Sequence, residues 1–135
     1  MKRRILLTVV ALVLLLLIMG SCRRASKSMI LSESDAGKTA EMSIGDELAI
    51  TLVGNPSTGY GWEVVPVEGA VLEPVGEPEF EADSDLIGAP GKITLGFKAI
   101  RAGQQTLRLI YRRPWEEQAE PLETFEVTVI VKGDQ

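Results

Sequence analysis

Residues 47–64 read ELAITLVGNPSTGYGWEV, in which two alternating runs flank a segment of turn-forming residues. Large apolar residues occupy every second position over 48–52 and again over 60–64. A period of two places one set of side chains on the buried face of a β-strand and leaves the other set in water. The Gly, Asn, Pro and Ser residues between the runs are those that turns require. The stretch therefore predicts two β-strands joined by a short loop.

The same alternation predicts β-structure from about Lys38 to Lys132, and no helical stripe of apolar residues follows residue 21. Seven short antiparallel strands in one domain are typical of an all-β, immunoglobulin-like sandwich of two sheets. A barrel of the OB or lipocalin kind is the structural alternative. The paired cysteines of antibody domains are absent, so only the architecture is predicted. We expect about seven strands, at residues 38–44, 46–53, 60–66, 70–80, 92–100, 104–112 and 122–132.

The first 21 residues differ in composition from the rest of the chain. A basic start at residues 2–4 precedes residues 5–19, which are all apolar except Thr8, and the small residues Gly20 and Ser21 follow. This order is typical of a secretory signal peptide. The alternative, an uncleaved anchor helix, is less favoured because a membrane-spanning helix needs about 20 apolar residues.

The only cysteine, Cys22, directly follows these small residues. Met19-Gly20-Ser21-Cys22 resembles the bacterial lipobox, which implies cleavage before Cys22 and attachment of a diacylglycerol to its thiol, with further fatty acid securing the anchor. The alternative is a cysteine that falls there by chance behind a plain signal peptide. The resemblance predicts an exported lipoprotein of the cell envelope, and Arg23 in place of Asp favours the outer membrane or the periplasmic face.

Three parts of the chain are thus predicted. Residues 1–21 form the signal peptide, residues 22–36 the lipidated cysteine and a flexible tether, and residues 37–135 the β-domain. The tether is rich in Ser and charge, as flexible spacers are. Its apolar island at residues 29–31 is either part of the spacer or a first edge strand.

Composition excludes several kinds of function. The chain has 135 residues with 14 Lys+Arg, 19 Asp+Glu, no His and one Cys. It therefore lacks the imidazole of Ser-His-Asp and Cys-His hydrolases, the ligands of a Cys/His zinc site and any internal disulfide. Removing the signal peptide leaves 11 basic and 19 acidic residues, a net charge of −8 that suits nucleic acid poorly. No spacing singles out a catalytic carboxylate pair, so we expect no enzyme, cofactor or metal.

One connection between predicted strands is unusually well suited to forming a stiff loop. Pro56 fixes its own φ and keeps Asn55 extended, whereas Gly59 permits a positive φ. Side-chain oxygens nearby can satisfy local backbone groups and place hydroxyls at the tip. A plain turn is the alternative. The residues are Asn55, Pro56, Ser57, Thr58, Gly59 and Tyr60.

Two further connections carry features of a binding surface. Residues 88–91 contain two glycines, which let a partner approach the backbone closely, although a mobile acidic loop after the run 77–85 would look similar. Trp115 lies beside Pro and Arg in a charged connection, which is the composition of an interface anchor. It could instead fold back over the sandwich edge, whereas Trp62 belongs to a strand and is expected in the core.

Together the three connections resemble the signature loops of the chagasin family, inhibitors of papain-like cysteine proteases. The family patterns are Asn-Pro-Thr-Thr-Gly-Tyr/Phe, Gly-x-Gly-Gly and Arg-Pro-Trp/Phe, and the resemblance covers nearly all of residues 38–132. Ser57 departs from the first pattern but keeps a hydroxyl, and Pro90 departs from the second and stiffens it. The matching residues are Asn55-Pro56-Ser57-Thr58-Gly59-Tyr60, Gly88-Ala89-Pro90-Gly91 and Arg113-Pro114-Trp115.

The resemblance implies a monomeric, reversible and competitive inhibitor whose three loops enter the active-site cleft of a papain-like protease. Residues 55–60 would block the catalytic cysteine, and residues 88–91 would lie along one side through backbone contacts. Trp115 would pack on the other side, with Arg113 nearby. The alternative function is a lipid-anchored β-sandwich module that binds a non-protease envelope or secreted protein.

Overall fold

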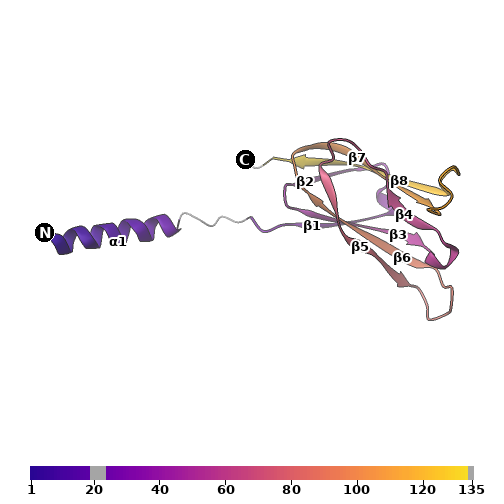
Figure 1. Cartoon of the computed structure of the whole chain (residues 1–135), viewed down its shortest axis with the longest axis horizontal. Coiled ribbons are helices and arrows are strands. Elements are labelled where there is room, and N and C mark those ends of the chain that lie inside the picture. Colours follow the sequence, from indigo (N-terminus) through magenta and orange to yellow (C-terminus); the bar gives the residue numbers. More distant parts are fainter. Residues whose placement is uncertain (19–23, 134–135) are drawn as a thin grey trace.

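The computed structural model describes residues 1–18 and 24–133, which form one helix and two β-sheets (Figure 1). Two single turns of 3-10 helix, η1 (Glu33–Asp35) and η2 (Pro56–Thr58), interrupt the β-structure. The remaining elements are α1 (Lys2–Ile18), β1 (Ser28–Ser32), β2 (Thr39–Ser43), β3 (Glu47–Gly54), β4 (Gly61–Val64), β5 (Leu72–Ala82), β6 (Gly91–Ala99), β7 (Gly103–Arg112) and β8 (Glu123–Lys132).

The two sheets contain four strands each and confirm the predicted all-β sandwich. Their strand orders are β1-β3-β6-β5 and β2-β8-β7-β4. The expectation of about seven antiparallel strands needs correction. Eight strands form within the described residues, and two of their pairings, β1 with β3 and β2 with β8, are parallel. Alternation in sequence reports which face of a strand is buried, but it carries no information about strand direction or partner.

The predicted tether is also shorter than its composition indicated. Residues 28–32 form β1, which pairs along its full length with β3, from Ser28 opposite Glu47 to Ser32 opposite Thr51. The edge-strand alternative for the apolar island is therefore correct, and residues 28–35 belong to the folded domain. Ser32 and Asp35 then close η1 in a capping box, which turns the chain from one sheet to the other.

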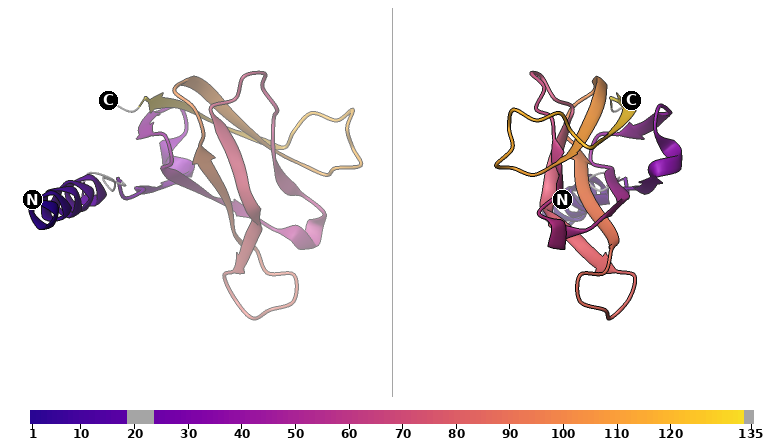
Figure 2. Two further views of the ribbon diagram at one scale, coloured as in Figure 1. Left: turned by 60° about the vertical axis from the view of Figure 1, so that its left-hand side comes forward. Right: turned by 90° about the vertical axis from the view of Figure 1, so that its right-hand side faces the viewer.

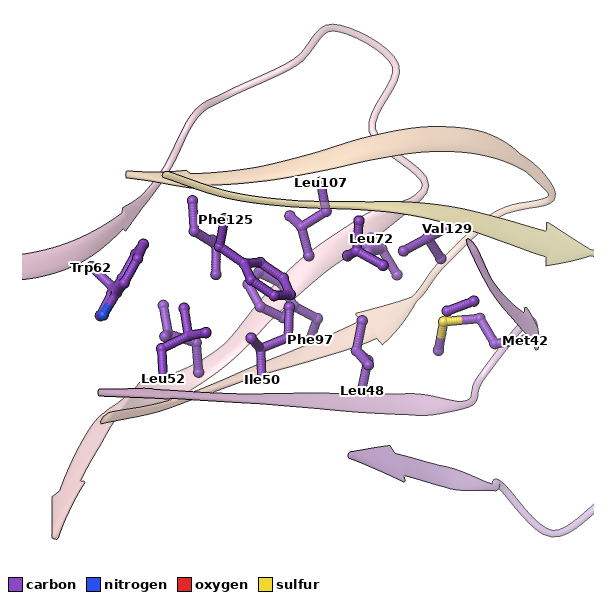
Figure 3. Packing of buried hydrophobic residues seen from close by; sticks show 14 of the residues in the cluster. Met42, Leu48, Ile50, Leu52, Trp62, Leu72, Phe97, Leu107, Phe125 and Val129 are labelled. Atoms are coloured by element: carbon purple, nitrogen blue, oxygen red, sulfur yellow. The ribbon is translucent and has the colours of Figure 1, made fainter. Parts of the chain in front are cut away.

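The core lies between the sheets and follows the predicted alternation. In β3, buried Leu48, Ile50 and Leu52 alternate with more exposed residues, and their side chains face those of the opposite sheet (Figure 3). Each such side chain contributes about 1.5–3 kcal/mol when fully buried. Trp62 is 7% exposed, as expected of a core residue, and its indole N–H donates to the carbonyl of Val53 (3.0 Å).

The predicted signal segment is helical over α1, up to Ile18. Among the described residues, no helix combines the length and apolar character needed to cross a membrane. The predicted lipobox and its Cys22 fall within residues 19–23, outside the described residues.

The three connections singled out from the sequence lie at one end of the sandwich. Gly54, the last residue of β3, pairs with Gly91 at the start of β6, which in turn pairs with Ala82 at the end of β5. Gly61 at the start of β4 pairs with Arg112 at the end of β7. The pairings bring the loops after β3, β5 and β7 to the same end, as Figure 1 shows.

Candidate functional site

The first loop, residues 55–60, is a tight turn held by its own side chains. Asn55 has extended dihedrals (φ −142°, ψ 94°) and caps η2, accepting a hydrogen bond at Oδ1 from the backbone of Ser57 (3.1 Å). The Ser57 hydroxyl donates to the same oxygen (2.6 Å). Thr58 Oγ1 donates to the carbonyl of Asn55 (2.6 Å). Three of the predicted hydroxyl and amide groups thus stiffen the loop from within.

Gly59 ends this turn with the positive φ that the sequence predicts. Its φ of +81° places it in the left-handed region, where a side chain is strained. The position is also crowded, because a Cβ added to Gly59 would lie 2.4 Å from the ring of Trp115. The backbone therefore favours glycine here, and a side chain at this position would also displace the Trp115 ring.

The base of the first loop is fixed to the core through Tyr111 of β7. The backbone N–H of Asn55 donates to the Tyr111 hydroxyl (2.9 Å), and Tyr111 is buried. The rings of Tyr60 and Trp62 lie 5.3 and 5.1 Å from the Tyr111 ring, measured between centroids. This aromatic cluster supports the loop from below. Tyr111 is not among the predicted site residues, because it lies in the strand predicted at residues 104–112 and only its contacts mark it as part of the site.

The second loop, residues 83–90, projects beyond β5 and β6 (Figure 2). Gly88 has a φ of +77°, and its carbonyl accepts a hydrogen bond from the Asn55 carboxamide (3.0 Å). Pro90 accepts from the backbone of Asp83 (2.9 Å) and so closes the hairpin. The two most exposed apolar side chains of the loop, Leu86 and Ile87, were not among the predicted contact residues.

Gly91 differs from the other predicted residues of this loop. It is the first residue of β6, is buried, and pairs with strands on both sides. A Cβ at this position would lie 2.0 Å from the carbonyl oxygen of Glu81. The structure thus gives this glycine a packing role between backbones, and it leaves residues 88–90 as the accessible part of the predicted segment.

The third loop places Arg113 and Trp115 against the first. The Arg113 guanidinium donates through Nε to the carbonyl of Thr58 (3.0 Å) and lies 4.6 Å above the centre of the Tyr60 ring. It also pairs with Glu116 (3.5 Å) within its own loop. Trp115 stands beside Gly59 but remains 69% exposed, so it is an accessible aromatic surface rather than a core residue.

The three loops are consequently one connected surface. Asn55 links the first loop to the second, and Arg113 links the first loop to the third. The accessible surface combines a polar turn, a glycine-containing backbone and an indole ring. Among the described residues no cluster of three or more His, Cys, Asp or Glu side chains could hold a metal ion. The arrangement suits recognition of another macromolecule through shape.

Comparison with known proteins gives this surface a family context. A family described as "Chagasin family peptidase inhibitor I42" matches residues 41–129. Amoebiasin-2 of Entamoeba histolytica is 32% identical over 104 residues, covering 76% of this chain and 85% of that protein. Chagasin of Trypanosoma cruzi is 31% identical over 105 residues, covering 73% and 91% of the two chains.

A solved structure is similar over most of its length. The crystal structure of the cysteine protease inhibitor EhICP2 from Entamoeba histolytica superimposes with a TM-score of 0.67 at 30% identity. The match covers 79% of this chain and 97% of that one.

Proposed function

Because this chain belongs to the chagasin family of peptidase inhibitors, we propose that it is a reversible, competitive inhibitor of papain-like cysteine proteases. The family consists of inhibitors rather than enzymes. The observation that carries the proposal is the connected three-loop surface with the exposed Trp115 at its edge. A surface of this kind enters a cleft as a wedge, and no covalent step is needed.

Within the wedge, residues 55–60 cover the catalytic cysteine of the protease and exclude substrate from it. Residues 88–90 lie along one wall of the cleft, where the glycine lets backbone approach backbone. Trp115 packs on the opposite wall and is the natural hot spot, since large aromatic residues contribute most at interfaces. Arg113 stabilises the first loop through its contacts with the carbonyl of Thr58 and the ring of Tyr60.

The internal hydrogen bonds of the first loop lower the entropic cost of binding. Immobilising a flexible side chain at an interface costs about 0.5–1.5 kcal/mol. Asn55, Ser57 and Thr58 are already held by one another before any partner arrives. Most of this ordering cost is therefore met during folding, and more of the contact energy appears as affinity.

We further propose that the inhibitor is a lipoprotein of the cell envelope, anchored through Cys22 after removal of residues 1–21. This rests on the basic, apolar and small-residue order of the leader and on the lipobox-like sequence before the single cysteine. Replacing Cys22 by Ser should abolish incorporation of a fatty-acid analogue into the chain expressed in a bacterium. Undiminished labelling of the Cys22→Ser chain would contradict the anchor.

The inhibitory function can be tested with residues 22–135 carrying Cys22→Ser. The chain must begin before Ser28, because β1 is part of the sandwich. We expect dose-dependent, reversible loss of papain activity, relieved by raising the substrate concentration, and no effect on a trypsin-like serine protease. No inhibition of several papain-like enzymes at micromolar protein would contradict the proposal and favour a non-protease partner for the same loops.

A further inference from the structure

The chain enters the sandwich at the end opposite the three loops. Ser28, the first residue of β1, pairs with Glu47 at the start of β3, whereas the first loop follows Gly54 at the other end of β3. The seven steps from the first to the last residue of β3, at about 3.3 Å each, separate the two ends by about 23 Å. Figure 1 shows the loops on the side of the domain away from the entering chain.

The segment before β1 is fastened where it enters. The buried carboxylate of Asp46 accepts hydrogen bonds from the backbone N–H groups of Lys27 and Ser43, both at 2.9 Å. The carbonyl of Lys27 in turn accepts from the backbone of Glu47 (2.9 Å). Lys27 is thus held through both its peptide groups, so the chain is fixed at the point where residues 24–26 leave the domain.

The C-terminal end of the domain lies at the same end of the sandwich. Lys132, the last residue of β8, pairs with Ser43. A Cβ added to the following Gly133 would lie 3.6 Å from Ala102, in the turn between β6 and β7. The three loops therefore project from the end opposite to both of these segments.

From this geometry we infer that the sandwich separates the three loops from the point of attachment and sets the direction in which they face. A chain held at a surface by its N-terminal segment presents the three loops away from that surface, to papain-like proteases arriving from the aqueous side. The inference rests on the proposed inhibitory function. A protease of about 200 residues has a radius of gyration of about 16 Å, so a partner bound beyond the loops has room to clear the surface. Attachment at the loop end would leave no such room.

Three single-cysteine variants test the inference, all made in residues 22–135 with Cys22→Ser. Ala25→Cys and Gly133→Cys place the attachment at the entry end, and Gln118→Cys places it in the third loop; all three positions are exposed. Each is coupled to maleimide-bearing lipid in neutral phosphatidylcholine vesicles, and the inhibition constant for papain is measured. Coupling to a small soluble maleimide instead of lipid shows whether modification alone affects inhibition.

We expect inhibition by the vesicle-bound Ala25→Cys and Gly133→Cys proteins to stay within about threefold of their soluble forms. Vesicle-bound Gln118→Cys should inhibit at least tenfold less than its own soluble conjugate, which carries the same modification without the surface. Equal inhibition by all three vesicle-bound forms, or a matching loss at Ala25→Cys, would overturn the inference. Absence of inhibition by every soluble form would instead overturn the proposed function.

Fluorescence gives a readout of orientation that does not depend on inhibition. Trp115 is exposed and Trp62 is buried, so quenchers report mainly on Trp115. Soluble iodide should quench vesicle-bound Ala25→Cys as it quenches the free protein, and brominated lipid should not. In vesicle-bound Gln118→Cys, brominated lipid should quench the fluorescence and soluble iodide should not. Quenching of Ala25→Cys by brominated lipid would show loops facing the surface and would contradict the inference.

Discussion

At the scale of single residues, Asn55 connects three parts of the molecule. It caps η2, receives support from Tyr111 and bridges to Gly88. Asn55→Ala should weaken papain inhibition about tenfold, because an ordered loop becomes flexible and each lost hydrogen bond is worth about 0.5–1.5 kcal/mol. Inhibition constants and thermal melting of the two proteins measure the effect.

Asn55→Asp is the matched control for this prediction. The carboxylate keeps an acceptor for Ser57 but cannot donate to the carbonyl of Gly88. Inhibition by Asn55→Asp should therefore lie between that of the parent protein and that of Asn55→Ala. Unchanged inhibition by both variants would show that the link between the first two loops has no role in binding.

Trp115 tests the opposite case, a residue that matters for binding but little for folding. Its side chain is 69% exposed, so Trp115→Ala should leave the melting temperature nearly unchanged. Loss of a hot-spot aromatic costs about 2 kcal/mol or more, which is about a thirtyfold weaker inhibition constant. Trp115→Phe should retain part of the affinity. Full inhibition by Trp115→Ala would remove this residue from the proposed interface.

At the scale of elements, the strands that sequence could predict are those with a long buried face. β3, β6, β7 and β8 alternate over eight to ten residues, and their buried positions are those of the predicted pattern. The sequence does not decide β1, because this strand has five residues and a mixed face, with Ile30 exposed and its neighbours half-buried. Its parallel pairing depends on β3, a partner that a local pattern does not reveal.

The candidate site also contains features that local sequence predicts and contacts that it does not. Pro56 and Gly59 act through their own backbone, so the extended Asn55 and the positive φ of Gly59 could be predicted. The contacts of Asn55 with Gly88 and of Arg113 with Thr58 join segments 33 and 55 residues apart. Such contacts, and the support from Tyr111, follow from strand register and could not be read from local sequence.

β1 provides the prediction that belongs to this scale. A chain starting at residue 36 lacks β1 and η1, including the hydrogen bond between the Glu33 carboxylate and the backbone of Val53. It also exposes core surface covered by the half-buried Met29 and Leu31. We expect it to be less stable than residues 22–135 with Cys22→Ser by about 2 kcal/mol or more. Chemical denaturation measures this, and equal midpoints would contradict a structural role for β1.

At the scale of the whole molecule, the carboxylate of Asp46 makes the folding stability of the domain depend on pH. It lies at the end of the sandwich away from the loops. Hydrogen bonds from the backbone of Lys27, then of Ser43, hold the pKa of its carboxyl below the usual value. Because the folded pKa is lowered, the stabilisation is complete above the unfolded pKa of about 3.9. It is lost as the pH falls through the folded pKa.

Asp46→Asn should therefore lower the melting temperature at pH 7 and flatten its decline below pH 4. The carboxamide offers one acceptor where two backbone donors need partners, a cost of about 1–3 kcal/mol. For a domain of this size each kcal/mol shifts the melting temperature by about 4–8 °C. Glu68→Gln, an exposed carboxylate in the connection between β4 and β5, serves as the control and should melt like the parent. Papain inhibition at pH 7 and low temperature should be unchanged in both variants, because neither residue lies in the three loops and the Asp46 hydrogen bonds are at the opposite end of the sandwich. Parallel pH profiles for the parent and Asp46→Asn would show that this carboxylate does not hold the N-terminal segment.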